Sequence, residues 1–301
     1  MHSLPSPTSW NLDPAVLIVA ALLLAGYFFA ITRLRARYSD EPVPRKRVVY
    51  FVAGVLSLAL TLCTPLDTLG RYYLLSAHTL QLLLLTTVSA PFLMMGLPEW
   101  LVTLLVPLRA LRDATRGLLF PIIAAISYNV IIMVWHAPPL YDQALQNNLV
   151  HNIQMLCFLI AGVLTWWPVL TPLDHHARMS SPFQMLYLGA ESLPLDIFGV
   201  IMIFATSVLY PVYATAPRLF GISPMVDQQI AGGLLAVPGN LLDIVLFSIV
   251  FFIWIERQEK EQRAREREQY AQEDAATFAA ATAEVSLSAP SETAGENDGV
   301  G

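Results

Sequence analysis

Long runs of apolar residues, separated by short polar segments, dominate the first 255 residues of the chain. A helix that crosses a bilayer needs about 20 mostly apolar residues, because the hydrocarbon layer is about 30 Å thick and each residue advances the helix by about 1.5 Å. Seven segments meet or approach that length: residues 15–32, 48–64, 74–95, 117–135, 152–170, 182–210 and 229–255. The pattern predicts an all-α, polytopic membrane protein, a bundle of seven transmembrane helices.

The pattern changes after residue 255. Residues 256–274 are rich in good helix formers and in opposite charges four residues apart, which favour a charged helix in water. Residues 275–301 are mostly small, polar or acidic without apolar periodicity, so we expect a disordered acidic tail. These two segments follow an N-terminal segment of residues 1–14 and the seven-helix domain of residues 15–255.

Basic residues predict the orientation of the bundle, because lysine and arginine are retained on the cytoplasmic side. If the N-terminus lies outside the cytoplasm, every basic residue except Arg71 and Arg218 falls in a cytoplasmic segment. We therefore expect an extracytoplasmic N-terminus and a cytoplasmic C-terminus, with the charged helix and the tail inside the cell.

Composition agrees with a membrane protein and excludes several kinds of site. The chain is 55% hydrophobic and only 13% charged, whereas the surface of a soluble domain of this length needs more charge. Its two cysteines, Cys63 and Cys157, lie far apart in apolar runs, so the chain has neither a CxxC motif nor a disulfide framework. No HExxH or nucleophile motif occurs, so we expect a protein that is not an enzyme.

Three histidines share the outer face in this topology. His78 begins the third helix, His136 ends the fourth and His151 begins the fifth, while Met155 shares a helix face with His151. Histidine is the commonest transition-metal ligand and thioether sulfur selects soft Cu(I). The four residues therefore indicate a mixed nitrogen and sulfur copper site open to the outside. The alternative is that each histidine is an interfacial residue that is hydrogen-bonded to a neighbouring loop.

Other polar residues are expected at the same face. They are Asp67, Asp142, Tyr210, Tyr213, Asp227 and Gln228.

Three carboxylates, Glu191, Asp196 and Asp243, fall inside the sixth and seventh apolar runs. Burying a charge in a bilayer is expensive, so intramembrane carboxylates are functional by default. They favour a second hypothesis, a proton-coupled membrane transporter. The alternative is that Glu191 reaches the inner interface, and that the aspartates are protonated or bonded to backbone at helix breaks near Pro194.

Several motifs, in order along the chain, carry a resemblance to a known family. They are TPLDTLGRYYLLSAHTLQLLLL (64–85), PFLMMGLPEWL (91–101), WHAPPLYDQAL (135–145), GVLTWWPVL (162–170), VLYPVYA (208–214) and DQQIAGGLLAVPG (227–239). On these motifs the sequence resembles the CtaG family of cytochrome c oxidase assembly factors, over about residues 67–252.

The resemblance implies a role and a setting. Members of this family are seven-helix membrane proteins implicated in supplying copper to heme-copper oxidases, so it implies a copper-delivering assembly factor in the bacterial cytoplasmic (plasma) membrane. The implied cofactor is Cu(I), held by His78, His136 and His151. The expected partners are heme-copper oxidase subunits and the lipid bilayer, with no nucleic acid.

The chain departs from the family pattern at three places. The pattern usually has a second histidine four residues after His78 and after His151, where this chain has Leu82 and Met155. A Met-Trp pair after the DQxxAG motif is replaced here by Leu235 and the alanine that follows it. Only the methionine keeps a soft ligand, so the resemblance implies a divergent member with a thinner ligand set.

Overall fold

The computed structural model of the chain describes residues 4–105, 120–170 and 180–288, except for the side chains of residues 238–240, 242, 243 and 277–288. The chain divides into two compact units, Met1–Val250 and Phe251–Gly301. Within the described ranges every regular element is a helix, and two of these, labelled η, are π-helices.

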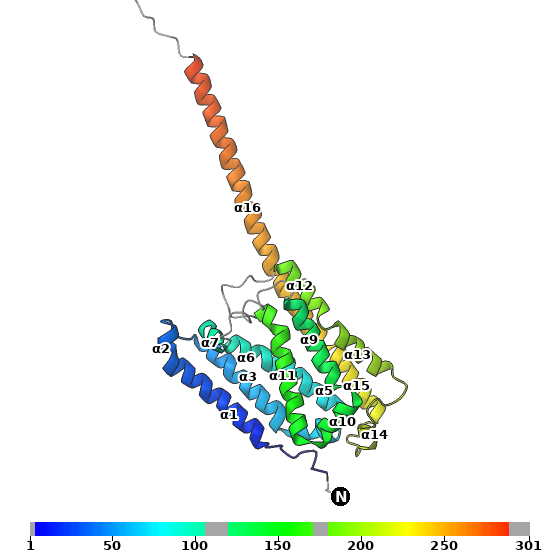
Figure 1. Cartoon of the computed structure of the whole chain (residues 1–301). Helices are drawn as coiled ribbons and strands as arrows, with labels where there is room; N and C mark the ends of the chain where they lie inside the picture. Colours follow the sequence, from blue (N-terminus) through cyan, green and yellow to red (C-terminus); the bar gives the residue numbers. More distant parts are fainter. Residues whose placement is uncertain (1–3, 106–119, 171–179, 289–301) are drawn as a thin grey trace, which may run out of the picture. The chain divides into compact units, whose positions relative to one another are not determined.

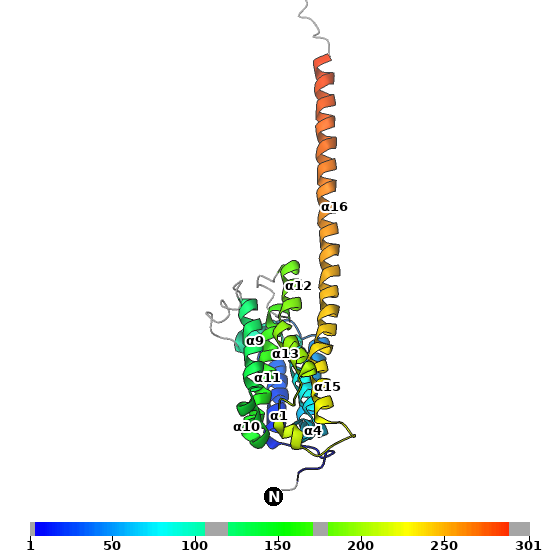
Figure 2. The same ribbon diagram turned by 90° about the vertical axis from the view of Figure 1, so that its right-hand side faces the viewer.

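In the membrane-spanning part of the first unit, several helices follow one another directly or after a short break, such as α1, η1 and α2 (Figures 1 and 2). The elements of this part are α1 (Pro14–Phe29), η1 (Ala30–Leu34), α2 (Arg35–Tyr38), α3 (Arg45–Cys63), α5 (Leu75–Leu83), η2 (Leu84–Ser89), α6 (Ala90–Gly96), α9 (Phe120–Trp135), α11 (Asn148–Leu170), α12 (Ser181–Ala190) and α13 (Leu193–Phe204). The shorter or later helices are α4 (Pro65–Tyr72), α7 (Glu99–Leu105), α10 (Pro138–Gln146), α14 (Pro211–Thr215), α15 (Pro224–Ala236) and α16 (Pro238–Ser288).

Five helical stretches of the described chain are long and apolar enough to cross a membrane, and a sixth is bent. The five are Pro14–Tyr38, Arg45–Cys63, Leu75–Gly96, Asn148–Leu170 and Ser181–Phe204. The sixth combines α9 and α10, which meet at an angle of 68°. Many large apolar side chains on these helices are exposed, including Leu22, Ile126 and Leu156, as expected where lipid covers the surface. The fold is that of a multi-pass membrane protein.

The seventh expected span, residues 229–255, is divided in the structure. Helix α15 ends at Ala236 and α16 begins at Pro238, and this region is not among the candidate spans of the described residues. Proline lacks the N–H that would continue the helix and disfavours a helical conformation at the residue before it. The break at Val237 therefore has a local cause in the sequence.

The bundle is held by close helix pairs. Helix α3 packs on α6, α9 on α11, and α15 on both α13 and α5. The core between them is apolar, with Leu82, Ile132 and Phe158 completely buried. Figures 1 and 2 show the N-terminus, α4 and α10 at one end of the first unit, with α2, α7 and α12 at the other. We call the first of these the N-terminal end of the bundle.

The second unit begins within α16 and contains the charged part of that helix. Ion pairs four residues apart, such as Lys260 with Glu256 and Arg263 with Glu259, lie along it. The helix runs on to Ser288, further than the boundary at residue 274 that composition suggests.

Candidate metal-binding site

The histidine-bearing helices begin or end together at the N-terminal end of the bundle. Asp227 on α15 fixes the start of α5, because its carboxylate accepts hydrogen bonds from the backbone N–H groups of Leu75 (2.7 Å) and Ser76 (3.2 Å). A carboxylate is favourable there, since the first N–H groups of a helix have no partner within it. This cap positions His78, one turn further along α5.

His136 lies at the bend between α9 and α10. Helix α9 ends here because Ala137 takes an extended conformation before Pro138. The Nδ1–H of His136 donates to the carbonyl of Ile132 at 2.8 Å. A neutral imidazole has one protonated nitrogen, so this bond leaves Nε2 of His136 as the lone-pair nitrogen.

His78 and His136 lie next to each other. Their ring centroids are 5.7 Å apart, and the rings of Tyr141 and Phe158 pack against both. His78 is 0% exposed, and within the described chain neither of its ring nitrogens has a hydrogen-bond partner. The pair thus offers nitrogen atoms that the described protein does not use.

Three buried tyrosines, Tyr141, Tyr210 and Tyr213, support this pair. The hydroxyl of Tyr213 donates to the carbonyl of Gly70 at 2.6 Å and accepts from Tyr141 at 2.7 Å, while that of Tyr210 donates to the carbonyl of His136 at 2.8 Å. Burial raises the pKa of Tyr210 and of Tyr213, so both stay protonated and keep donating. These bonds tie α4, α10 and α14 together around the histidines.

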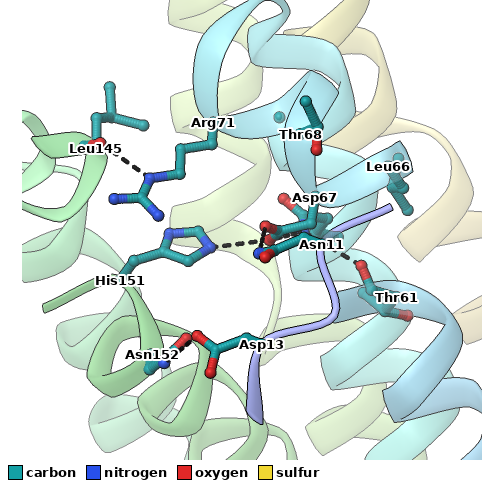
Figure 3. Close-up of polar contacts among 12 residues, drawn as sticks. Asn11, Asp13, Thr61, Leu66, Asp67, Thr68, Arg71, Leu145, His151 and Asn152 are labelled. Atoms are coloured by element: carbon teal, nitrogen blue, oxygen red, sulfur yellow. Dashed lines mark hydrogen bonds and ion pairs between the residues drawn. The ribbon is translucent and has the colours of Figure 1, made fainter. Parts of the chain in front are cut away.

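The third histidine, His151, is held by a buried carboxylate (Figure 3). Its Nε2 lies 2.9 Å from Oδ1 of Asp67, and the same oxygen accepts from Nε2 of Gln81 at 2.9 Å. The other oxygen of Asp67 accepts from Asn11 at 2.6 Å. Burial alone would raise the pKa of Asp67, but the hydrogen bonds and the charge interaction with His151 lower it overall. Asp67 is therefore an ionised acceptor.

The predicted ligands do not form one cage. The structure brings His78 and His136 together, bonds His151 to Asp67, and buries Met155 one turn beyond His151 on α11. Among the described residues no group of three or more His, Cys, Asp or Glu side chains is arranged to hold a metal ion. Any metal held by the pair would therefore have few protein ligands.

The remaining predicted polar residues of this face have separate places. Gln228 accepts from the backbone N–H of Leu209 at 2.6 Å and so fixes the segment that carries Tyr210. Asp227 caps α5, as described above, and Asp142 on α10 is partly exposed.

Comparison with known protein families identified one matching family. The family model described as cytochrome c oxidase caa3 assembly factor (Caa3_CtaG) matches residues 25–257. The chain belongs to this family. Neither the curated proteins nor the solved structures gave a significant match.

Membership makes the chain a cytochrome c oxidase assembly factor, and that role implies association with the oxidase. The match contains the three histidines and Asp67, whereas Asn11 lies before it. The resemblance predicted from the motifs is thus confirmed at the level of the family.

The intramembrane carboxylates of the assembly factor lie away from the histidines. Glu191, between α12 and α13, is buried and accepts a hydrogen bond from the hydroxyl of Thr165, and Asp196 accepts from Ser192 at 3.1 Å. Both line a small cavity of about 30 Å³. The side chain of Asp243 lies outside the described residues. Nothing in the described part supports the transporter hypothesis.

Two site residues were missed by sequence reasoning, Gln81 and Gln154. Each follows a histidine by three residues, so the segments His78–Gln81 and His151–Gln154 share the pattern His-x-x-Gln near the start of two spans. This repeated spacing is the sequence signal that both glutamines share. Both glutamines are completely buried.

Proposed function

We propose that this assembly factor holds Cu(I) at the outer membrane face and passes it to a heme-copper oxidase subunit, without catalysing a reaction. The observation that carries the proposal is the adjacent His78–His136 pair, with both nitrogens of His78 buried and unpartnered in the described chain. An unpaired buried polar group costs about 1–3 kcal/mol. A metal ion bound to one nitrogen of His78 removes that cost at the nitrogen it binds.

The chemistry of the pair suits a cargo that must be released. Imidazole nitrogen binds copper well, and a buried thioether, Met155, lies on the neighbouring helix. Few protein ligands leave coordination positions for the accepting protein. We treat copper here as the cargo of the assembly factor, not as a resident cofactor.

We further propose that the chain crosses a bacterial plasma membrane seven times, with its N-terminus outside. Arg35, Arg37 and Arg45 lie on α2 and the start of α3, at the opposite end of the first unit from the histidines (Figure 1). Retention of basic residues in the cytoplasm then puts the site outside, where an oxidase copper centre is accessible. In this proposal α15 and the apolar start of α16 together form the seventh crossing.

Gene deletion and complementation test the copper proposal. We expect a deletion strain to lose cytochrome c oxidase activity, with partial recovery when copper is added to the medium. Wild-type protein and the control Val134→Ala, an exposed position near the end of α9 and two residues before His136, should restore activity. His78→Ala and His136→Ala, expressed at equal levels in the membrane, should each restore less than about a tenth of the wild-type oxidase activity. Normal oxidase activity in the deletion strain, or full complementation by both histidine variants, would contradict the proposal.

A further inference from the structure

The carboxylate of Asp67 is surrounded by donors. Gln81 and His151 share Oδ1, each at 2.9 Å, and Asn11 donates to Oδ2 at 2.6 Å. Figure 3 shows His151 and Asn11 at this carboxylate. Asp67 is 2% exposed, so these three partners take the place of water. Its oxygens are thereby occupied, and Asp67 is poorly placed to bind a metal ion itself.

Asp67 determines which nitrogen of His151 carries the proton. A carboxylate only accepts, so Nε2 of His151 is the protonated nitrogen, and in the neutral ring Nδ1 keeps its lone pair. This Nδ1 is buried, and within the described chain it has no hydrogen-bond partner. A carboxylate behind an imidazole is the usual arrangement that fixes the orientation of a metal-binding histidine and raises its basicity.

The same carboxylate orients Gln81. The amide nitrogen of Gln81 donates to Asp67 and to the carbonyl of Thr61, so its Oε1 is directed elsewhere, buried and unpartnered in the described chain. Both amide atoms of Gln154, three residues after His151, are also buried without a partner there.

The unpartnered atoms are concentrated in two segments, which meet at Asp67 through Gln81 and His151. Of the buried side-chain atoms without a partner in the described chain, all except Oδ1 of Asn129 belong to the two His-x-x-Gln segments on α5 and α11. Buried polar groups in proteins almost always have a partner, from the protein, water or a ligand. Their concentration here indicates a position that a ligand occupies.

We propose that Asp67 is a positioning residue that presents Nδ1 of His151 as a ligand nitrogen, giving the copper site a second binding position beside the His78–His136 pair. This inference rests on the proposed function. Imidazole nitrogen supplies the bond to copper, and the amides of Gln81 and Gln154 supply hydrogen-bonding groups for water or for the other ligands of the ion. Asp67 acts through His151 and does not touch the metal.

Metal titration of the purified full chain tests the inference. Competition with a chromophoric Cu(I) chelator should give two Cu(I) ions per chain for the wild type. Asp67→Asn should weaken the second ion about 10- to 100-fold, the usual effect of losing such a carboxylate, and leave the first unchanged. An amide at residue 67 retains one acceptor where the carboxylate has two, so it cannot satisfy all three donors.

The matched control is Asp13→Asn. Like Asp67, Asp13 is a carboxylate that accepts a hydrogen bond from a side chain of α11. Its donor is Asn152, at 2.8 Å, and not His151. This variant should bind two ions with wild-type affinity. Equal loss in both variants would mean that removing either carboxylate charge weakens binding, which would overturn the specific role of Asp67.

A second measurement observes His151 in the wild-type protein itself. In protein labelled with ¹⁵N at histidine, the metal-free wild type should show the signal of His151, assigned with His151→Gln, as protonated at Nε2 and unprotonated at Nδ1. Addition of Ag(I), a redox-stable substitute for Cu(I), should shift the Nδ1 signal. A proton on Nδ1, or an unshifted signal at two equivalents of Ag(I), would overturn the inference.

The two proposals fail differently. If His136→Ala binds the first ion as tightly as the wild type, the proposed function fails. If His136→Ala loses the first ion while the wild type binds only one and Asp67→Asn keeps it, the proposed function stands and only the second position is rejected.

Discussion

Tyr213 shows how single polar contacts hold the site. Its hydroxyl donates to the carbonyl of Gly70 on α4 and accepts from Tyr141 on α10, while Tyr213 itself lies on α14. Three short helices, whose sequences give no direct indication that they meet, are joined through one oxygen atom. One oxygen of Asp67 likewise joins distant parts of the chain, because its partners Gln81 and His151 are 14 and 84 residues away.

Removal of the Tyr213 hydroxyl should destabilise the protein measurably. Tyr213→Phe leaves the Gly70 carbonyl and the Tyr141 hydroxyl without a partner in an apolar surrounding, so we expect a loss of about 1–3 kcal/mol in the free energy of unfolding. Unfolding by SDS in mixed micelles, followed by circular dichroism, measures the change.

The exposed Tyr270→Phe is the control and should change the free energy by less than about 0.5 kcal/mol. Adding Tyr141→Phe to Tyr213→Phe should cost less than the sum of the single changes, because the two hydroxyls share one bond. Strict additivity would argue against that bond.

At the scale of elements, small residues determine how closely helices approach. A Cβ atom added to Gly232 on α15 would lie 2.5 Å from the carbonyl oxygen of Gly199 on α13, and one added to Gly199 would lie 2.7 Å from the oxygen of Gly232. The two backbones are therefore in contact, as in other membrane helix pairs. This contact sets the position of α15, which carries the Asp227 cap of α5.

Substitution by alanine should have different effects at the two neighbouring glycines, Gly232 and Gly233. Gly232→Ala forces α13 and α15 apart or strains both, so we expect a loss of about 1–3 kcal/mol. Gly233→Ala is the matched control, because nothing lies within 4 Å of the added atom and alanine favours a helix more than glycine does. It should be neutral or slightly stabilising in the same SDS titration, and similar losses in both variants would contradict the close contact.

Element boundaries were only partly predictable from the sequence. The apolar run of residues 74–95 matches the helical stretch Leu75–Gly96, but the structure inserts the π-helix η2 in its middle. The wider turn frees carbonyl groups, and that of Thr86 accepts from the indole of Trp166 on α11 at 2.8 Å. No hydropathy pattern predicts this insertion, because it depends on a partner from another helix.

At the scale of the whole molecule, the segment before α1 crosses the N-terminal end of the bundle, where the histidines lie. Its residues are bonded to α4, to the link after α4 and to α11: Asn11 donates to Asp67, Tyr73 donates to the carbonyl of Pro5, and Asn152 donates to Asp13. The segment therefore covers the buried carboxylate from outside.

Reporter fusions test the orientation of the whole molecule. Alkaline phosphatase, which is active only outside the cytoplasm, should be active when fused after Gln146 or after Thr215, the ends of α10 and α14. Green fluorescent protein fused after Gly301 should fluoresce, because it folds in the cytoplasm. The matched fusions with the two reporters exchanged should be inactive and dark. The opposite pattern would reverse the proposed topology and move the histidines to the inner face.

The sequence by itself determined the helical class, the membrane setting, the approximate limits of six helical stretches and the presence of three histidines near helix ends. These properties follow from local composition, because a run of apolar residues partitions into lipid whatever its neighbours are. The tertiary structure alone decided that His78 meets His136 while His151 is bonded to Asp67. Hydropathy leaves the rotation and lateral position of each helix open, and contacts such as Gly199 with Gly232 determine them.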